Sequence, residues 1–142
     1  MSTAGYSGKT LAQKLGLKPG DTLRAIGAPP HYPSLLEPLP AGARLLEEAD
    51  NPAIVHAFVR CVADLEHIAE ALIAMPARGG SLWISWPKKT SGLFVDLTEG
   101  GVRRVLLPTG WVDVKVCAVD LDWSGLKFLR RRAPGPRAAN AA

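Results

Sequence analysis

Two continuous apolar runs and one amphipathic segment dominate the second half of the chain. Residues 54–59 are apolar on both faces of an extended strand apart from His56, and residues 82–86 form a second such run. Strands buried on both faces inside a parallel sheet have this pattern. Between them, residues 64–75 carry apolar side chains at spacings of three and four, which predicts an amphipathic helix. The pattern therefore predicts a β-α-β unit.

The first half has shorter and weaker patterns. Thr10 to Gln13 matches a capping box, which predicts a short helix from residue 11. Residues 22–28 predict a strand that ends at two prolines. Residues 32–40 predict one or two helical turns, and residues 44–48 a short strand.

The last part of the chain predicts a helix and a hairpin. Residues 96–99 resemble a helix cap, and an apolar stripe through residues 102–106 follows them. Residues 111–119 alternate like a half-exposed strand, and residues 126–129 return after a connection too short for a parallel crossover. The fold class expected is α/β: a small Rossmann-like three-layer domain with a mainly parallel sheet and an antiparallel C-terminal hairpin.

The basic excess lies at the C-terminal end of the chain. The 142 residues include 17 basic and 13 acidic side chains, and Arg130, Arg131, Arg132 and Arg137 follow the last expected strand. Without those four, 13 basic residues balance the 13 acids. We expect one folded domain over residues 10–132, a flexible N-terminus over 1–9 and a disordered tail over 133–142. Nucleic acid is not expected as a partner of the neutral domain.

Composition and spacing point away from several other classes. Cys61 and Cys117 have no metal-ligand or disulfide-framework spacing, so no metal is expected. The first nine residues lack the apolar core of a signal peptide, and no stretch of about 18 apolar residues predicts a membrane span. The expected location is the cytoplasm, and no pattern sets an oligomeric state.

Five segments of the chain carry a resemblance to a known family: residues 6–8, 11–16, 83–89, 112–120 and 123–127. Together they resemble the bacterial family known as domain of unknown function 3052, most specifically over 82–89 and 112–127. Membership implies a fold but no assigned activity. Gly100 and Gly101 depart from the helix formers expected there, which affects the predicted start of that helix.

The layout from residue 54 onward is also similar to the second half of a class I methyltransferase. The turn at residues 77–80, which contains Gly79 and Gly80, resembles a segment that precedes a buried strand in those enzymes. A cofactor loop for S-adenosylmethionine (SAM) needs glycines after the first strand, whereas residues 26–30 offer one glycine and two prolines. Glu47 or Glu48 could hold the ribose, although solvated surface acids are the favoured interpretation. No cofactor is therefore expected.

The best candidate site is the basic loop that follows the second buried run. Trp86 leads into Lys88 and Lys89, and Ser91 and Gly92 follow in the same loop. Ligands bind at the carboxyl ends of parallel strands, and the next helix would direct free backbone donors at the same place. The two ammonium groups suit an anion such as a phosphate or carboxylate. The competing interpretation is a pair of solvated loop charges.

Asp120 and Trp123 extend this candidate site. They lie in the expected hairpin connection, where a tryptophan is unusual. We expect Trp123 to pack back over the sheet edge and Asp120 to form a salt bridge with Lys88 or Lys89. His56 is expected to be a hydrogen-bonded core residue, and Ser85 has no partner base that the sequence reveals.

Three functions remain open. The favoured one is a non-catalytic binding or regulatory module that holds an anionic small molecule or a protein partner at the loop of residues 86–89. The alternative is a divergent transferase of the methyltransferase type. A further alternative is a nucleic-acid-associated protein that uses the arginine tail.

Overall fold

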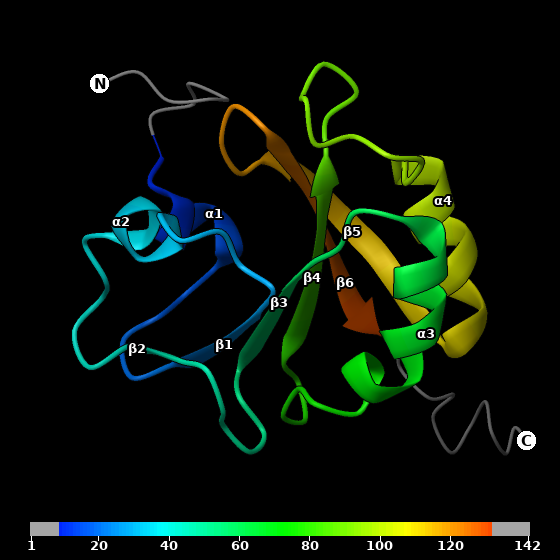
Figure 1. Ribbon diagram of the computed structural model, residues 1–142. Coiled ribbons are helices and arrows are strands. Elements are labelled where there is room, and N and C mark those ends of the chain that lie inside the picture. Colours follow the sequence, from blue (N-terminus) through cyan, green and yellow to red (C-terminus); the bar gives the residue numbers. More distant parts are fainter. Residues whose placement is uncertain (1–8, 132–142) are drawn as a thin grey trace, which may run out of the picture.

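The computed structural model describes residues 9–131 as a six-stranded sheet between two layers of helices (Figure 1). The elements in chain order are α1 (Leu11–Leu15), β1 (Thr22–Ile26), α2 (Tyr32–Leu36), β2 (Arg44–Leu46), β3 (Ile54–Phe58), α3 (Val62–Ile73), β4 (Ser81–Pro87), α4 (Glu99–Leu106), the 3-10 helix η1 (Leu107–Thr109), β5 (Trp111–Ala118) and β6 (Trp123–Arg130). The expected flexible ends lie outside the described residues, apart from Lys9. None of the described helices is long and apolar enough to cross a membrane.

The strand order of the sheet is β2-β1-β3-β4-β6-β5. β2, β1, β3 and β4 run parallel to one another. β6 is antiparallel to β4, and β5 pairs antiparallel with β6 at the edge. This arrangement confirms the predicted α/β class with a mainly parallel sheet and an antiparallel C-terminal hairpin.

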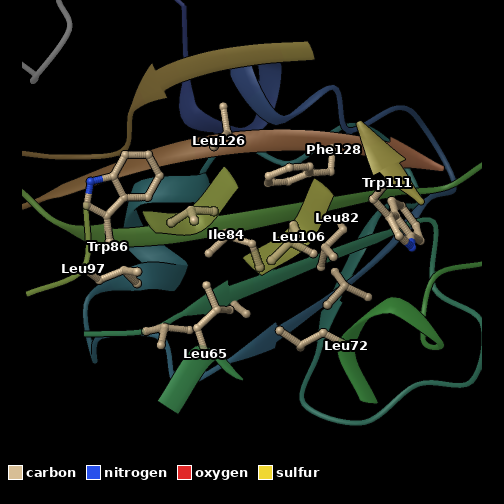
Figure 2. Close-up of a cluster of buried hydrophobic side chains, with 14 residues drawn as sticks. Leu65, Leu72, Leu82, Ile84, Trp86, Leu97, Leu106, Trp111, Leu126 and Phe128 are labelled. Atoms are coloured by element: carbon tan, nitrogen blue, oxygen red, sulfur yellow. The ribbon is translucent and has the colours of Figure 1, made fainter. Parts of the chain in front are cut away.

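Alternating side chains of β3 and β4 build two separate hydrophobic layers. On one face, a cluster that includes Val55, Ile84 and Leu126 packs under α3 and α4. On the other face, a cluster that includes Ile54 and Trp83 packs under α1 and α2. Every residue of β3 and β4 is buried, as the continuous apolar runs predict. Figure 2 shows the first cluster, with Trp86 beside Leu97 at one end and Trp111 at the other.

Gly80, in the turn before β4, is one of the two glycines named in the resemblance to methyltransferases. A Cβ atom on Gly80 would lie 2.6 Å from the carbonyl oxygen of Ala53 and 2.9 Å from that of Ala77. Only glycine, which has no Cβ atom, can come so close to these two carbonyl oxygens. Gly80 therefore lets the turn pack against the start of β3, so its role here is structural.

Several boundaries differ from the sequence prediction, and those of α3 and β6 affect the assignments made above. α3 runs from Val62 rather than residue 64, because the segment after β3 enters the helix directly with Cys61 as its N-cap. β6 begins at Trp123, so this tryptophan is a strand residue and not part of the turn. Arg130 also belongs to β6, where its guanidinium lies 4.7 Å from the centre of the Trp111 ring. The capping box at Thr10 is confirmed.

A chain of polar groups crosses the otherwise apolar layer under α2. The hydroxyl of Tyr32 lies 2.6 Å from His56 Nδ1, and His56 Nε2 lies 2.7 Å from Ser85 Oγ. All three residues are buried. The His56 ring also stacks on Phe58 with centroids 4.3 Å apart. His56 is thus the hydrogen-bonded core histidine that the sequence predicts. The expectation that Ser85 lacks a partner base is wrong, because His56 is that partner.

Burial lowers the pKa of His56 to about 3, because the charged imidazolium would lose its hydration. The neutral ring keeps one donor and one acceptor nitrogen, which is what Tyr32 and Ser85 need. In the unfolded chain the pKa returns to about 6.5. Between these values the unfolded state binds more protons than the folded one, so stability falls as the pH falls.

We therefore predict that the free energy of unfolding drops by about 2 kcal/mol through His56 between pH 7.5 and pH 5. Urea unfolding across this range measures it. His56→Gln keeps hydrogen-bonding groups but cannot titrate, so its pH slope should be shallower than that of the natural protein. His67→Gln, on the exposed side of α3, should retain the natural slope. Equal slopes in all three proteins would contradict the assignment.

Candidate functional site

The parallel strands place a switch point between β1 and β3. From β1 the chain moves to β2 on one side, and it then returns to β3 on the other side of β1. The connections that leave β1 and β3 therefore diverge, with α2 on one face of the sheet and α3 on the other (Figure 1). In open α/β sheets, ligands bind outside the carboxyl ends of strands at such a point.

The loop after β1 forms one wall of this switch point. Gly27 has a φ of 68°, and a Cβ atom there would lie 3.0 Å from the carbonyl oxygen of Phe58 at the end of β3. Its lack of a side chain lets the two strand ends approach one another. Pro29 and Pro30 follow and have no backbone N–H to offer a ligand. The loop is tight at its start and poor in donors further on.

Acidic side chains follow β2 on the other side of β1. Glu47 and Glu48 come directly after Leu46, and both are exposed. The register pairs Arg24 with Leu46, so these acids continue beside the last residues of β1. They therefore lie at the carboxyl edge of the sheet, where carboxylates can accept hydrogen bonds from the hydroxyls of a sugar.

A pocket of about 330 Å³ opens at the carboxyl end of β4. It is lined by Trp86, Pro87, Lys88, Lys89, Leu97, Thr98, Glu99, Gly100 and Ser124. The backbone N–H of Lys88 donates to the carbonyl of Asp122 at 2.8 Å, which fastens the basic loop to the β5–β6 hairpin. The structure thus brings Trp86, Lys88 and Lys89 together with the first turn of α4.

The charges around this pocket are mixed. Glu99 lines the pocket together with the lysines, and its carboxylate lies 2.7 Å from Nη1 of Arg103. Arg103 also donates from Nε to Asp113 at 2.8 Å, and this contact lowers the pKa of the Asp113 carboxyl. Thr98 caps α4 by accepting from the N–H of Gly101. The remaining positive charge of the pocket therefore comes from Lys88 and Lys89, close to the N-terminal end of a helix.

The other predicted site residues do not line this pocket. Ser91 accepts from the N–H of Leu93 at 3.0 Å and shapes the loop, and Gly92 is exposed. Trp123 is buried and packs edge-on against Phe58 with centroids 5.0 Å apart. Trp123 therefore packs on the sheet, as the sequence predicts, but on the face of α1 and α2 rather than beside the lysines.

Asp120 pairs with a histidine instead of the predicted lysines. Its Oδ2 lies 2.8 Å from His31 Nε2, and its Oδ1 accepts from the N–H groups of Asp122 and Trp123 at 2.8 and 2.9 Å. The expected salt bridge with Lys88 or Lys89 is wrong, because the turn directs the Asp120 carboxylate toward the loop after β1. The His31 side chain is half exposed.

The sequence did not indicate the His31–Asp120 pair, because 89 residues separate its members. It did not indicate Ser124 in the pocket either, since the expected strand started at residue 126. Asp96 was expected to cap α4, but its Oδ1 accepts from the N–H of Val62 at 2.9 Å and caps α3. Asp96 and Val62 are 34 residues apart in the sequence, so local spacing cannot reveal this cap.

Comparison with solved structures identifies the fold. DhpI in its complex with SAH superposes with a TM-score of 0.59 at 11% identity, over 87% of this chain and 83% of that chain. A magnesium protoporphyrin IX methyltransferase from Synechocystis with bound SAM gives 0.59 at 12% identity, over 84% and 74%. A putative type 11 methyltransferase from Sulfolobus solfataricus gives 0.58 at 14%, over 88% and 92%.

These structures share with the chain an α/β, Rossmann-like methyltransferase fold. Such low identities show the fold alone. No family model matches the sequence. No curated protein matches it either.

The turn at Asp120 generates a stability prediction. Asp120→Ala removes the acceptor of two backbone N–H groups and should lower the free energy of unfolding by about 1–2 kcal/mol. His31→Ala removes only a half-exposed contact and should cost no more than about 0.5 kcal/mol. Chemical denaturation measures both values. Equal losses would show that the ion pair, and not the turn, carries the stabilisation.

Proposed function

We propose that the protein is a divergent, methyltransferase-like protein that binds SAM or its demethylated form SAH at the carboxyl ends of β1, β2 and β3. The observation that carries the proposal is the switch point itself, where Gly27 closes a tight turn and Glu47 and Glu48 follow the neighbouring strand. The solved structures with this fold include ones described with SAH and with SAM. This likeness favours the transferase alternative over a purely non-catalytic module.

The residues at this edge fit such a ligand through its sugar and its charged end. Glu47 or Glu48 would accept hydrogen bonds from the ribose hydroxyls. Arg60, exposed just beyond β3, offers a cation for a carboxylate. Pro29 and Pro30 reduce the backbone donors, so we expect weaker binding than a glycine-rich loop would give.

SAM supplies an electrophilic methyl group when bound, and a transferase also needs an acceptor and a proton acceptor near it. His31 would be the proton acceptor, because its Nε2 contacts Asp120 and its Nδ1 remains as the free ring nitrogen. The pocket at the end of β4 would hold an anionic part of the acceptor through Lys88 and Lys89. We also propose membership of the domain-of-unknown-function 3052 family, which assigns no activity by itself.

Isothermal titration calorimetry with SAM and with SAH tests the proposal. We expect binding of both, weakened roughly tenfold by the double variant Glu47→Gln and Glu48→Gln, because a neutral amide is a poorer acceptor for hydroxyls. Glu66→Gln, on the exposed side of α3, is the matched control and should bind as the natural protein does. No heat with either compound at millimolar protein would rule the proposal out.

A second candidate function is a binding module that holds an anion at the Lys88–Lys89 pocket without catalysis. The proline-containing loop after β1 favours it, because that loop has few donors for a cofactor. Lys88→Gln with Lys89→Gln should then abolish the thermal stabilisation produced by acidic ligands such as nucleotides and acyl-CoA. Lys115→Gln, on the exposed edge strand, should leave it intact. Stabilisation that survives the double substitution would contradict this candidate.

A further inference from the structure

The amino edge of the sheet, opposite the site proposed above, carries a pocket of about 330 Å³. It opens where β3 and β4 begin and β6 ends. Its walls include Gly16 and Lys18 after α1, Arg78 in the turn before β4, and Lys127 on β6. Three chain segments that are distant in sequence therefore each bring one cation to the same concave surface.

These cations have no ion-pair partners among residues 9–131. The ion pairs found there involve only His31, Arg103 and their acidic partners. Asp21 is the one acid that lines the pocket, and its Oδ2 already accepts from the backbone N–H of Lys18 at 2.9 Å. The pocket therefore keeps a net positive charge.

Lys127 is the most constrained of the three. Its side chain is partly buried and lies on the strand position opposite both Trp83 and Lys115. The ammonium lies over the turn at Gly16, where a Cβ atom would be 3.6 Å from it. Burial, together with the nearby Lys115 and Lys18, lowers the pKa of Lys127.

Like charges directly opposite one another on neighbouring strands destabilise a sheet. Lys115 and Lys127 are such a pair, and Lys18 adds a third charge of the same sign nearby. Repulsion of this kind at one place is typical of a site where a bound group of opposite charge relieves it. Glycines on both sides, Gly16 and Gly79, leave the surface open to that group.

We propose that this pocket is a second ligand site, which binds a small phosphate-bearing molecule through Lys18, Arg78 and Lys127. Arg78 supplies a planar fork that matches phosphate oxygens, and the two lysines supply point charges. The pocket volume is at the lower end for small-molecule sites, which suits a compact ligand. The inference is independent of the proposed function, since it concerns the other edge of the sheet.

Calorimetry of the full chain with inorganic pyrophosphate, at constant ionic strength, tests the inference. Lys127→Gln should weaken binding roughly tenfold, and Arg78→Gln, at an exposed position that cannot disturb the core, should do the same. Arg104→Gln makes the same change of charge at an exposed position of α4, outside both edge pockets, and should bind as the natural protein does.

Two outcomes would overturn the inference. In one, pyrophosphate binds the Lys127→Gln and Arg78→Gln variants as tightly as the natural protein, or Arg104→Gln weakens its binding as much as they do. In the other, a short DNA duplex competes for these residues with higher affinity and a steep salt dependence, which would assign them to a nucleic-acid backbone.

Discussion

The burial of β3 and β4 on both faces is the constraint on which the other features depend. Each strand lies between two layers of helices, so every side chain along it must pack or find a hydrogen-bond partner. The apolar positions meet this requirement by filling the two clusters. The polar positions His56 and Ser85 meet it together, with Tyr32 from α2 as the third member of their chain. These three polar groups of the interior are thereby engaged with one another.

Because the interior is closed in this way, the candidate sites described above lie at the two edges of the sheet. The carboxyl edge gathers the Gly27 turn, the acids after β2, the His31–Asp120 pair and the pocket of Lys88 and Lys89. The amino edge gathers the three cations Lys18, Arg78 and Lys127. The first edge combines acids, a histidine and lysines and suits a ligand with several functional groups. The second has one sign of charge in excess and suits a simple anion.

The sequence predicted what depends on local pattern. Continuous apolar runs identified β3 and β4, three-and-four spacing identified α3, and the short connection identified the hairpin. Each of these signals lies within one or two elements, so it can be recognised from residues that are close in the sequence. The fold class followed from the order of those elements, because parallel strands with helical crossovers allow few arrangements.

What the sequence could not give depends on contacts between distant segments. Asp120 was assigned to the lysines because its loop adjoins theirs, yet the turn directs its carboxylate to His31. Asp96 was assigned to the helix that follows it, yet it caps an earlier one. Ser85 on β4 contacts His56 on the neighbouring strand β3, 29 residues earlier in the chain. In each case the partner lies on a segment that is distant in the sequence, so local spacing could not identify it.

Titration with SAH, followed through backbone amide chemical shifts, is the sharpest test for a ligand site at the carboxyl ends of β1, β2 and β3, because it locates a ligand as well as detecting it. We expect the shift changes to concentrate at residues 26–28, 31, 47–48 and 59–61, along the carboxyl ends of the first three strands in the sheet. Shifts confined to the amino edge, or none at saturating ligand, would contradict it.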